Sequence, residues 1–363
     1  MRITGVQVFP LESQRATHGE HGLVRVDTDE GISGWGSCYM TPALVRASLE
    51  YLSDQIVGEN PLEVDRVTEK LHQSTFWFGR GGVLTTFVSG INIALWDICG
   101  KALNQSVSCL LGGRQREKIK PYASQLFSWP VDAMVERLQI ARSKGFRAFK
   151  LGWQPFGRID AKTDEVLVRA AREAIGDDCD LMVDAGGSDA FWHSDLKWAI
   201  NASHMLKEYN VVWFEEALND GDLEGLKVLR EASPVWIATG ECLRKRQTFY
   251  PWIFQRAVDV LQPDLTCVGG ISDGRRIAWT ANDHGILVVF HGWNTAVGVA
   301  ADLQLSAALD QARFVEYLTP TPYIDGILAD PFQLDDEGML LIPDKPGLGI
   351  EIDEEAVRGL GIK

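Results

Sequence analysis

The sequence has 363 residues, of which 45% are hydrophobic and 23% are charged, an ordinary mix for a folded globular protein. This length exceeds the needs of one simple core and suits a barrel-sized domain plus a smaller one. The 35 Lys and Arg residues against 50 Asp and Glu residues give a net charge of −15, and such an acidic surface argues against nucleic acid and anionic membranes as partners.

The cysteines and the N-terminus indicate the compartment. Six cysteines are scattered without a CxxC pair, which predicts free, buried thiols in a reducing environment. The first residues, MRITGVQVF, alternate as in a strand and lack the regions of a signal peptide. Because no apolar run approaches about 20 residues, we expect no membrane span and a cytoplasmic protein.

The first unit reads as mixed α and β structure. Residues 3–11 alternate as a strand, and residues 21–36 form a hairpin whose turn is Asp29-Glu30-Gly31, with a polar loop before it. From Pro42 to Leu111 the pattern is helical, and the glycines of LLGGR end the last helix. We therefore expect an α+β capping domain over residues 1–115.

A different rhythm follows over residues 116–325. Short apolar strands alternate with amphipathic helices, which predicts a closed parallel barrel in an α/β protein. The alternative is an open doubly wound sheet, although no GxGxxG follows the first strand. The predicted strands are Ile119–Ala123, Ala148–Leu151, Leu181–Asp184, Val211–Phe214, Trp236–Ala238, Val258–Leu261, Ile286–Phe290 and Phe314–Tyr317.

The C-terminal segment, residues 326–363, lacks the helix that would follow the eighth strand. Its stretch DPFQLDDEGMLLIPDKPGLGIEIDEEAV is strand-like. We expect this segment to return to the capping domain and complete it.

Carboxylates end three consecutive strands of the predicted barrel. Asp184 ends the third, Glu215 and Glu216 end the fourth, and Glu241 ends the fifth. Active residues of such barrels cluster at these ends, where unpaired carboxylates would repel one another. Mg²⁺ prefers oxygen ligands and would relieve this repulsion, whereas no Cys/His spacing suggests zinc. The alternative is that each acid caps the helix after it.

The next two strands place an acid beside a histidine. Asp264 follows the sixth strand and His291 ends the seventh. A carboxylate bonded to one ring nitrogen fixes the tautomer and raises the basicity of the other, as a general base requires. The alternative is a structural histidine.

Two further charged residues face the same end. Lys150 on the second strand is a candidate carboxylate clamp or base, unless it is an ordinary surface lysine. Glu316 ends the eighth strand and is either a neutral acid that donates to a substrate oxygen or a solvated carboxylate.

Several motifs, in order and over essentially the whole chain, resemble the mandelate racemase subgroup of the enolase superfamily. GINIALWDICGKALNQSVSCLLGG resembles the helix of its capping domain, and VDAG, WFEEA and TGE resemble its three ligand motifs. QPDLTCVGG followed by HGW resembles its Asp–His dyad, and KPGLGIEID resembles its usual ending.

This resemblance implies a capping domain on a modified (β/α)7β barrel, with one Mg²⁺ held by Asp184, Glu215 and Glu241. The step shared by the family is abstraction of the proton alpha to a carboxylate, which gives a metal-stabilised enediolate. His291 would take the proton. The metal, Lys150 and Glu316 would stabilise the developing charge.

The sequence departs from this family in two places. Racemases and many dehydratases of the subgroup carry Lys-x-Lys on the second strand, whereas this chain has Lys150-Leu151-Gly152. One base on one face favours elimination over racemisation. The second departure is EEA in place of EEP, which leaves Glu215 and Glu216 both open as the ligand, although the spacing to Glu241 resembles the family and favours Glu215.

Substrate contacts are predicted from the family's closing loop and from aromatic residues. Arg15 and His18 lie in the loop RATHGEHG and are candidates for contact with the distal end of a substrate. A metal site in HGEH is a weaker alternative. Trp153 and Trp293 flank the proposed site and either exclude water or pack in the core.

The leading interpretation is an Mg²⁺-dependent dehydratase of an aldonic or aldaric acid that yields a 2-keto-3-deoxy acid. A racemase or epimerase of a 2-hydroxy acid is the second interpretation and needs another base. A non-catalytic scaffold or binding protein is the third, and the complete set of ligands and dyad argues against it. We also expect a homo-oligomer, as is common in the family.

Overall fold

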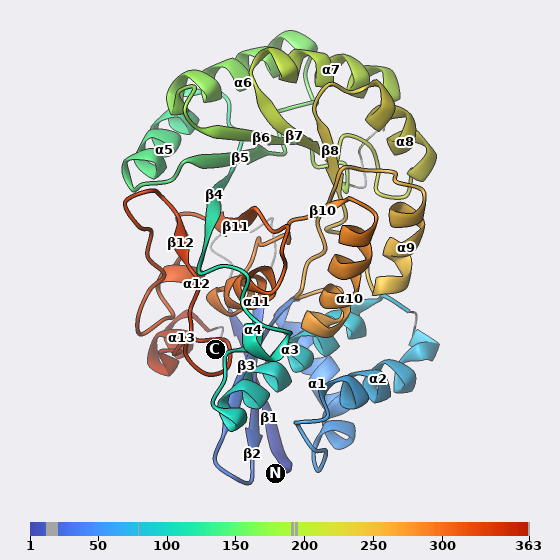
Figure 1. Cartoon of the computed structure of the whole chain (residues 1–363), viewed down its shortest axis with the longest axis vertical. Helices are drawn as coiled ribbons and strands as arrows, with labels where there is room; N and C mark the ends of the chain where they lie inside the picture. The colour runs from blue at the N-terminus through green and yellow to red at the C-terminus, as the bar shows by residue number, and fades with distance from the viewer. Residues whose placement is uncertain (12–20, 79, 190–191, 193–194, 362–363) are drawn as a thin grey trace.

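The computed structural model describes residues 1–11, 21–78, 80–189, 192 and 195–361. Arg15 and His18, predicted to contact substrate, lie outside the described residues. Figure 1 shows a barrel of strands and helices above a smaller N-terminal unit.

The N-terminal unit packs two helices, α1 and α3, against a three-stranded antiparallel sheet in the order β1-β2-β3, and α2 packs against these helices. The turn at residues 29–31 joins β2 to β3 as predicted. Gly36 of β3 lets the last helix approach closely, because a Cβ there would stand 1.8 Å from the carbonyl oxygen of Gly90. The elements are β1 (Ile3–Leu11), β2 (His21–Thr28), β3 (Ser33–Tyr39), α1 (Pro42–Ile56), α2 (Val64–Ser74), the short η1 (Phe76–Phe78) and α3 (Val83–Leu103).

Helix α3 is more apolar than we expected from the sequence. Its 21 residues are long and apolar enough to cross a membrane, so the prediction that no run approaches this length is wrong. The protein itself buries 89% of the apolar window, against β3 and the neighbouring helices. Burial on all sides explains the missing polar face, as in the central helix of a core.

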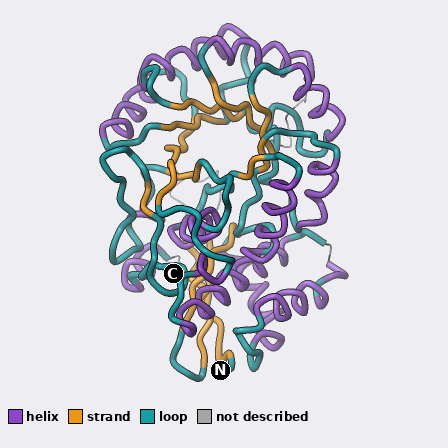
Figure 2. Tube along the Cα trace, in the orientation of Figure 1, coloured by secondary structure: helices purple, strands orange, loops and turns teal. Residues whose placement is uncertain are grey.

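The barrel strands follow one another in the order β10-β9-β8-β7-β6-β5-β4-β11, and the ring that they form is visible in Figure 2. Helices cover the outside of this ring, so the alternative of an open doubly wound sheet is wrong. The strands are β4 (Lys118–Leu126), β5 (Ala148–Gly152), β6 (Asp180–Asp184), β7 (Val211–Glu215), β8 (Trp236–Thr239), β9 (Val260–Leu261), β10 (Leu287–Val288) and β11 (Phe314–Leu318).

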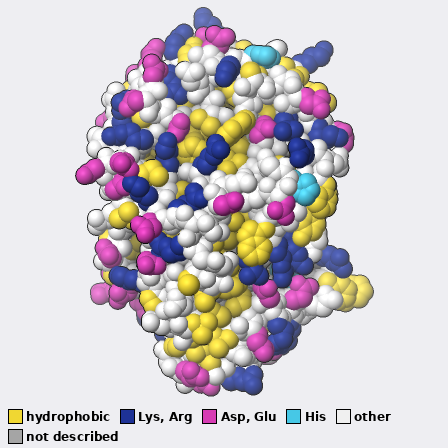
Figure 3. Space-filling view, in the orientation of Figure 1, with side chains coloured by type: hydrophobic (Ala, Val, Ile, Leu, Met, Phe, Trp, Pro, Cys, Tyr) yellow, Lys and Arg dark blue, Asp and Glu magenta, His cyan; other side chains and the backbone are white. Residues whose placement is uncertain are grey.

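The connecting helices run on the outer face. They are α5 (Asp132–Ser143), α6 (Ala161–Ile175), α7 (Leu196–Glu208), α8 (Leu223–Ala232), α9 (Arg246–Phe254), α10 (Gly270–Asp283) and α11 (Ala296–Ala307). The face in Figure 3 carries acidic and basic side chains interspersed, so the net negative charge forms no single block there.

A separate core fills the inside of the ring. Each strand or its immediate extension contributes one side chain to a buried cluster of Tyr122, Ala148, Met182, Trp213, Ala238, Val260, Val289 and Phe314. The ring of Trp213 packs edge-on against Tyr122, with centroids 5.5 Å apart. The Lys150 ammonium lies 5.6 Å from the centroid of Tyr122, so this packed layer supports the charged residues at the strand ends.

The C-terminal segment is mostly irregular, so its prediction as strand-like is wrong for most of its length. Up to residue 361, where the described part of the segment ends, its regular elements are the two-residue β12 (Leu340–Leu341) and the helix α13 (Glu354–Leu360), and the short α12 (Pro322–Asp325) precedes it. Prolines and glycines such as Pro343, Pro346 and Gly347 explain this, because they disfavour a regular ladder.

This segment touches both larger units. Strand β12 pairs antiparallel with β4 of the barrel, with Leu340 opposite Ile119. Farther on, the Leu348 amide donates to Asp97 of α3 at 2.9 Å, and Arg25 of β2 pairs with Glu354 at 2.7 Å. The division at residues 115 and 325 stays a prediction.

The described cysteines are all free, and four of them (Cys38, Cys99, Cys179 and Cys267) are buried, as predicted. The prediction is wrong for Cys109 and Cys242, which are exposed. Cys109 lies on the four-residue helix α4 (Val107–Leu110), which is too short to bury all its faces. Cys242 follows Glu241 in a loop beside a cavity.

Candidate active site

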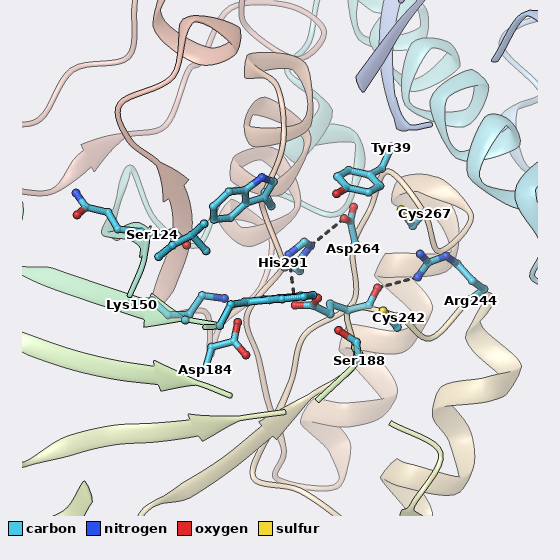
Figure 4. Close-up of a pocket in the computed structure, with 16 residues that line it drawn as sticks. Tyr39, Ser124, Lys150, Asp184, Ser188, Cys242, Arg244, Asp264, Cys267 and His291 are labelled. Atoms are coloured by element: carbon cyan, nitrogen blue, oxygen red, sulfur yellow. Dashed lines mark hydrogen bonds and ion pairs between the residues drawn. The ribbon is translucent and has the colours of Figure 1, made fainter. Parts of the chain in front are cut away.

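A cavity of about 270 Å³ opens at the carboxyl ends of the barrel strands, and Figure 4 shows its lining. It brings together most of the residues that the sequence predicted for the site, including both tryptophans. The lining residues are Tyr39, Ser124, Gln125, Leu126, Lys150, Gly152, Trp153, Asp184, Ser188, Glu241, Cys242, Arg244, Asp264, Cys267, His291 and Trp293.

Three carboxylates from neighbouring strands meet at this cavity. Asp184 ends β6 and lies in register with Glu215 at the end of β7, while Glu241 follows β8. One oxygen from each of the three lies within 4.8 Å of the other two. This arrangement of hard oxygen donors fits a small divalent cation.

Electrostatics also favour a cation there. Burial raises the pKa of Asp184 well above its usual range, and the charge of Glu215 adds to the effect. Burial likewise raises the pKa of Glu241. The cluster is therefore destabilised in its charged form, and a bound cation would compensate it.

The contacts of Glu215 and Glu216 indicate which of the two glutamates belongs to the acid cluster. Glu215 faces the ring interior, where it accepts hydrogen bonds from Lys150 at 2.7 Å, Trp213 at 3.0 Å and Gln262 at 2.7 Å. Glu216 has a backbone φ of +46° and turns away to accept from the Ser188 amide at 3.0 Å.

Glu216 nevertheless belongs to a second group of potential ligands. Its Oε1 is buried without a hydrogen-bond partner among the described residues, and an oxygen of Glu216 lies within 4.8 Å of Glu241 and Cys242 donor atoms. That group includes a thiol, a soft ligand, whereas Asp184, Glu215 and Glu241 offer only oxygens. The oxygen group fits Mg²⁺ better.

The predicted dyad is present in the structure. His291 Nδ1 lies 2.9 Å from Asp264 Oδ2, and the other carboxylate oxygen accepts from the amide and hydroxyl of Thr266. His291 Nε2 points to the acid cluster, 3.4 Å from Glu241 Oε2. Asp264 thus orients the ring and leaves Nε2 directed at the acid cluster.

The two members of the dyad hold opposite charges. Burial disfavours the charged Asp264 carboxylate, but the hydrogen bond to His291, the charge of His291 and the hydrogen bond from Thr266 together outweigh burial and lower the pKa of Asp264. Burial also disfavours the imidazolium, but the charges of Glu241 and Asp264 raise the pKa of His291 well above its usual range. A cation that neutralises Glu241 would lower this pKa and return His291 toward the neutral form that a base needs.

Lys150 is held as a charged group between two acids. Its Nζ lies 2.7 Å from Glu215 and 3.0 Å from Glu316, and only 3% of the residue is exposed, so it is not a surface lysine. Burial opposes its charge, yet the two glutamates raise its pKa well above the usual range. This favours a clamp over a base.

Glu316 matches neither of its sequence-based descriptions. It is fully buried and accepts from the Gly292 amide at 2.7 Å, so it is not solvated. Burial favours its neutral form, but Lys150 and His291 outweigh this and lower the pKa to about 2. Glu316 is therefore ionised. It lies in the middle of β11 and does not end this strand as predicted, and it joins β11 to the loop after β10, where His291 lies.

Gly152 occupies the position where the family often has a second lysine. A Cβ at Gly152 would stand 2.9 Å from Asp184 Oδ2 and 3.0 Å from Asp184 Cβ. The strand therefore leaves little space for a side chain at this position while the Asp184 carboxylate keeps its present place.

We expect Gly152→Ala to weaken Mg²⁺ binding about 10-fold, because the added methyl must displace the Asp184 carboxylate. Titration calorimetry with MgCl₂ measures this. Gly5→Ala is the matched control, since a Cβ at Gly5 meets nothing within 4 Å. Equal Mg²⁺ affinity in both variants would contradict the close contact.

The structure also adds residues that the sequence did not suggest. Gln262 and Trp213 fix Glu215, and Arg244 reaches the cavity from the loop after β8. Asp302 on α11 is a buried carboxyl whose two oxygens have no hydrogen-bond partner among the described residues, and burial raises its pKa well above the usual range. Of these four residues, only Gln262 could have been found from the sequence, because it is a polar residue at the end of a predicted strand.

Comparisons with known proteins identify the family. Residues 3–112 match the N-terminal domain of the mandelate racemase / muconate lactonizing enzyme family, and residues 133–356 match the enolase C-terminal domain-like family. D-galactarolactone cycloisomerase of Agrobacterium fabrum is 34% identical, and the match covers 98% of each chain.

Two further matches also span most of both chains. D-xylonate dehydratase of Haloferax volcanii is 31% identical over 92% of this chain and 84% of its own. The crystal structure of 3,6-anhydro-D-galactonate cycloisomerase from Zobellia galactanivorans has a TM-score of 0.91 and 28% identity, covering both chains completely. The protein is thus an enzyme, and it belongs to the enolase superfamily, within the mandelate racemase / muconate lactonizing enzyme family.

Proposed function

We propose that this enzyme is an Mg²⁺-dependent dehydratase of a sugar acid. It would remove the proton alpha to the carboxylate and eliminate the 3-hydroxyl to give a 2-keto-3-deoxy acid. The observation that carries this proposal is the single oriented base. His291 Nε2 lies 3.4 Å from one carboxylate of the three-acid cluster, and Asp264 holds the other ring nitrogen at 2.9 Å.

Asp184, Glu215 and Glu241 would hold the Mg²⁺, which draws charge from the carboxylate of the substrate and so acidifies its alpha proton. The side chains of the chain then act on the substrate. His291 accepts the alpha proton, and Lys150 offers a fixed positive charge beside the oxygen on which negative charge develops. As an imidazolium, His291 can protonate the departing 3-hydroxyl.

Racemisation has less support, because it needs a second base on the opposite face. Tyr39 and Cys267 line the cavity, but burial raises the pKa of each, and that of Cys267 reaches about 12. Lys150 is paired and charged. None of these groups is therefore set up to accept a proton near neutral pH.

Cycloisomerisation of a sugar-acid lactone or anhydro sugar acid is a second candidate, because two relatives with full-length matches carry that activity in their names. The same base would serve both reactions. In cycloisomerisation, the leaving group is an oxygen of the substrate's own ring, so no water is lost.

One experiment separates these activities. Mono- and diacid sugars and their lactones are incubated with the enzyme and MgCl₂ in deuterated water, and the products are examined by mass spectrometry and NMR. We expect loss of water and one deuterium at C3 of a 2-keto acid. A ring-opened product without loss of water indicates the cycloisomerase, and deuterium at C2 of recovered substrate indicates a racemase. No turnover of any sugar acid contradicts the proposal.

A further inference from the structure

Arg244 is a cation in the cavity that the proposed chemistry does not use. It lies in the loop between β8 and α9, three residues after Glu241. Its Nη1 donates to the backbone carbonyl oxygens of Glu241 at 2.7 Å and Leu243 at 3.4 Å. Figure 4 shows the guanidinium directed toward the interior of the cavity, on the same side as Asp264 and Cys267.

The guanidinium has unused hydrogen-bonding capacity. Among the described residues no carboxylate forms an ion pair with Arg244, and its Nε and Nη2 make no hydrogen bond. Lys150, the other cation of the cavity, is by contrast bound to two glutamates. Arg244 therefore presents a free planar fork of donors, the geometry that matches a carboxylate in a bidentate pair.

The surroundings keep Arg244 in its charged form. The side chain is mostly buried, which opposes its charge, although nearby thiols and acids such as Asp264 keep its pKa raised. A neutral end of a substrate would leave this cation without a direct ion-pair partner, whereas a carboxylate would supply one. The acid cluster is a poor site for a second substrate carboxylate, because the cluster itself is negatively charged.

We propose that Arg244 binds the distal carboxylate of the substrate and thereby selects sugar diacids, or their monolactones, over sugar monoacids. This inference rests on the proposed function only for the placement of the reacting end of the substrate. The first carboxylate would sit at the acid cluster with its cation, beside His291. The second would lie at Arg244.

The neighbouring residue Lys245 provides a matched control. Arg244 also borders a second cavity of about 270 Å³, between α2 and the start of α9, which Lys245 lines together with His72 and Arg80. Lys245 does not line the active-site cavity. Removing its charge tests whether any nearby cation suffices.

The kinetic test compares an aldarate with the aldonate of the same configuration, which differ only in a carboxylate or hydroxymethyl group at the far end. We expect the wild type to have a kcat/KM at least about 30-fold higher for the diacid. Arg244→Gln should remove this preference, mainly through a higher KM for the diacid. Arg244→Lys should retain part of the preference for the diacid, and Lys245→Gln should retain all of this preference.

Binding of unreactive acids tests the same point without turnover. Adipate and 6-hydroxyhexanoate have equal length, and calorimetry in MgCl₂ should show adipate bound at least about 10-fold more tightly by the wild type and equally by Arg244→Gln. Equal binding by the wild type, or loss of both ligands in the variant, would overturn the role of Arg244. If adipate binds as expected but no sugar acid is turned over, the proposed function fails and the diacid site stands.

Discussion

Replacing His291 with asparagine is expected to lower kcat by about 10³- to 10⁴-fold. Asparagine can still donate a hydrogen bond to Asp264, which lies 2.9 Å from the imidazole in the native protein, but it cannot accept the alpha proton. The acid cluster is unchanged, so Mg²⁺ affinity should stay within about 3-fold of the wild type. Steady-state kinetics and calorimetry measure the two quantities.

Exchange with solvent distinguishes loss of the base from general damage. The wild type should form product that carries solvent deuterium, and His291→Asn should show neither product nor exchange at C2. Asp264→Asn should lower kcat as well, because the ring loses the carboxylate that orients it and supports its positive charge. Activity of His291→Asn within 10-fold of the wild type would remove His291 from this role.

The second large effect concerns the metal ligands. Glu215→Gln should weaken Mg²⁺ binding by at least about 100-fold, because it removes one charged ligand and leaves Lys150 facing a neutral amide. Glu216→Gln should weaken it less than about 5-fold, since Glu216 turns toward the Ser188 amide. Calorimetric titration with MgCl₂ measures both.

This pair of variants also tests the choice between the two groups of potential ligands. Both changes are isosteric and buried, so melting curves without Mg²⁺ control for damage to the fold. A larger effect of Glu216→Gln would transfer the site to the group of Glu216, Glu241 and Cys242. In that case a thiophilic cation such as Cd²⁺ should bind more tightly than Mg²⁺.

Local patterns predicted much of this molecule. Each apolar run that ends in a carboxylate became a short strand, and because the strands are parallel, their carboxyl ends share one edge. Asp184, Glu215 and Glu241 were therefore brought together by chain order alone. The Asp264–His291 pair followed from the same reasoning on the next two strands.

Other features depended on contacts between distant segments. Alternation along β7 places Trp213 and Glu215 on one face but does not say which face is inside, and only Lys150 and Gln262 show that this face lines the site. The ionised state of Glu316 depends on Lys150, which is far from it in sequence. Arg244 carries no local signal, because its loop reaches the cavity only through the path of the chain after β8.

The order of apolar runs and the residue that ends each one determined the barrel, the acid cluster and the dyad, because strand direction and strand ends are local properties. Tertiary packing decided that Glu215 faces the acid cluster and that Gly152 has little room for a side chain. It also left Arg244 as the cation without an ion pair among the described residues of the cavity. The physical reason is that charge state and free space depend on all neighbours within a few ångströms, and these come from every part of the chain.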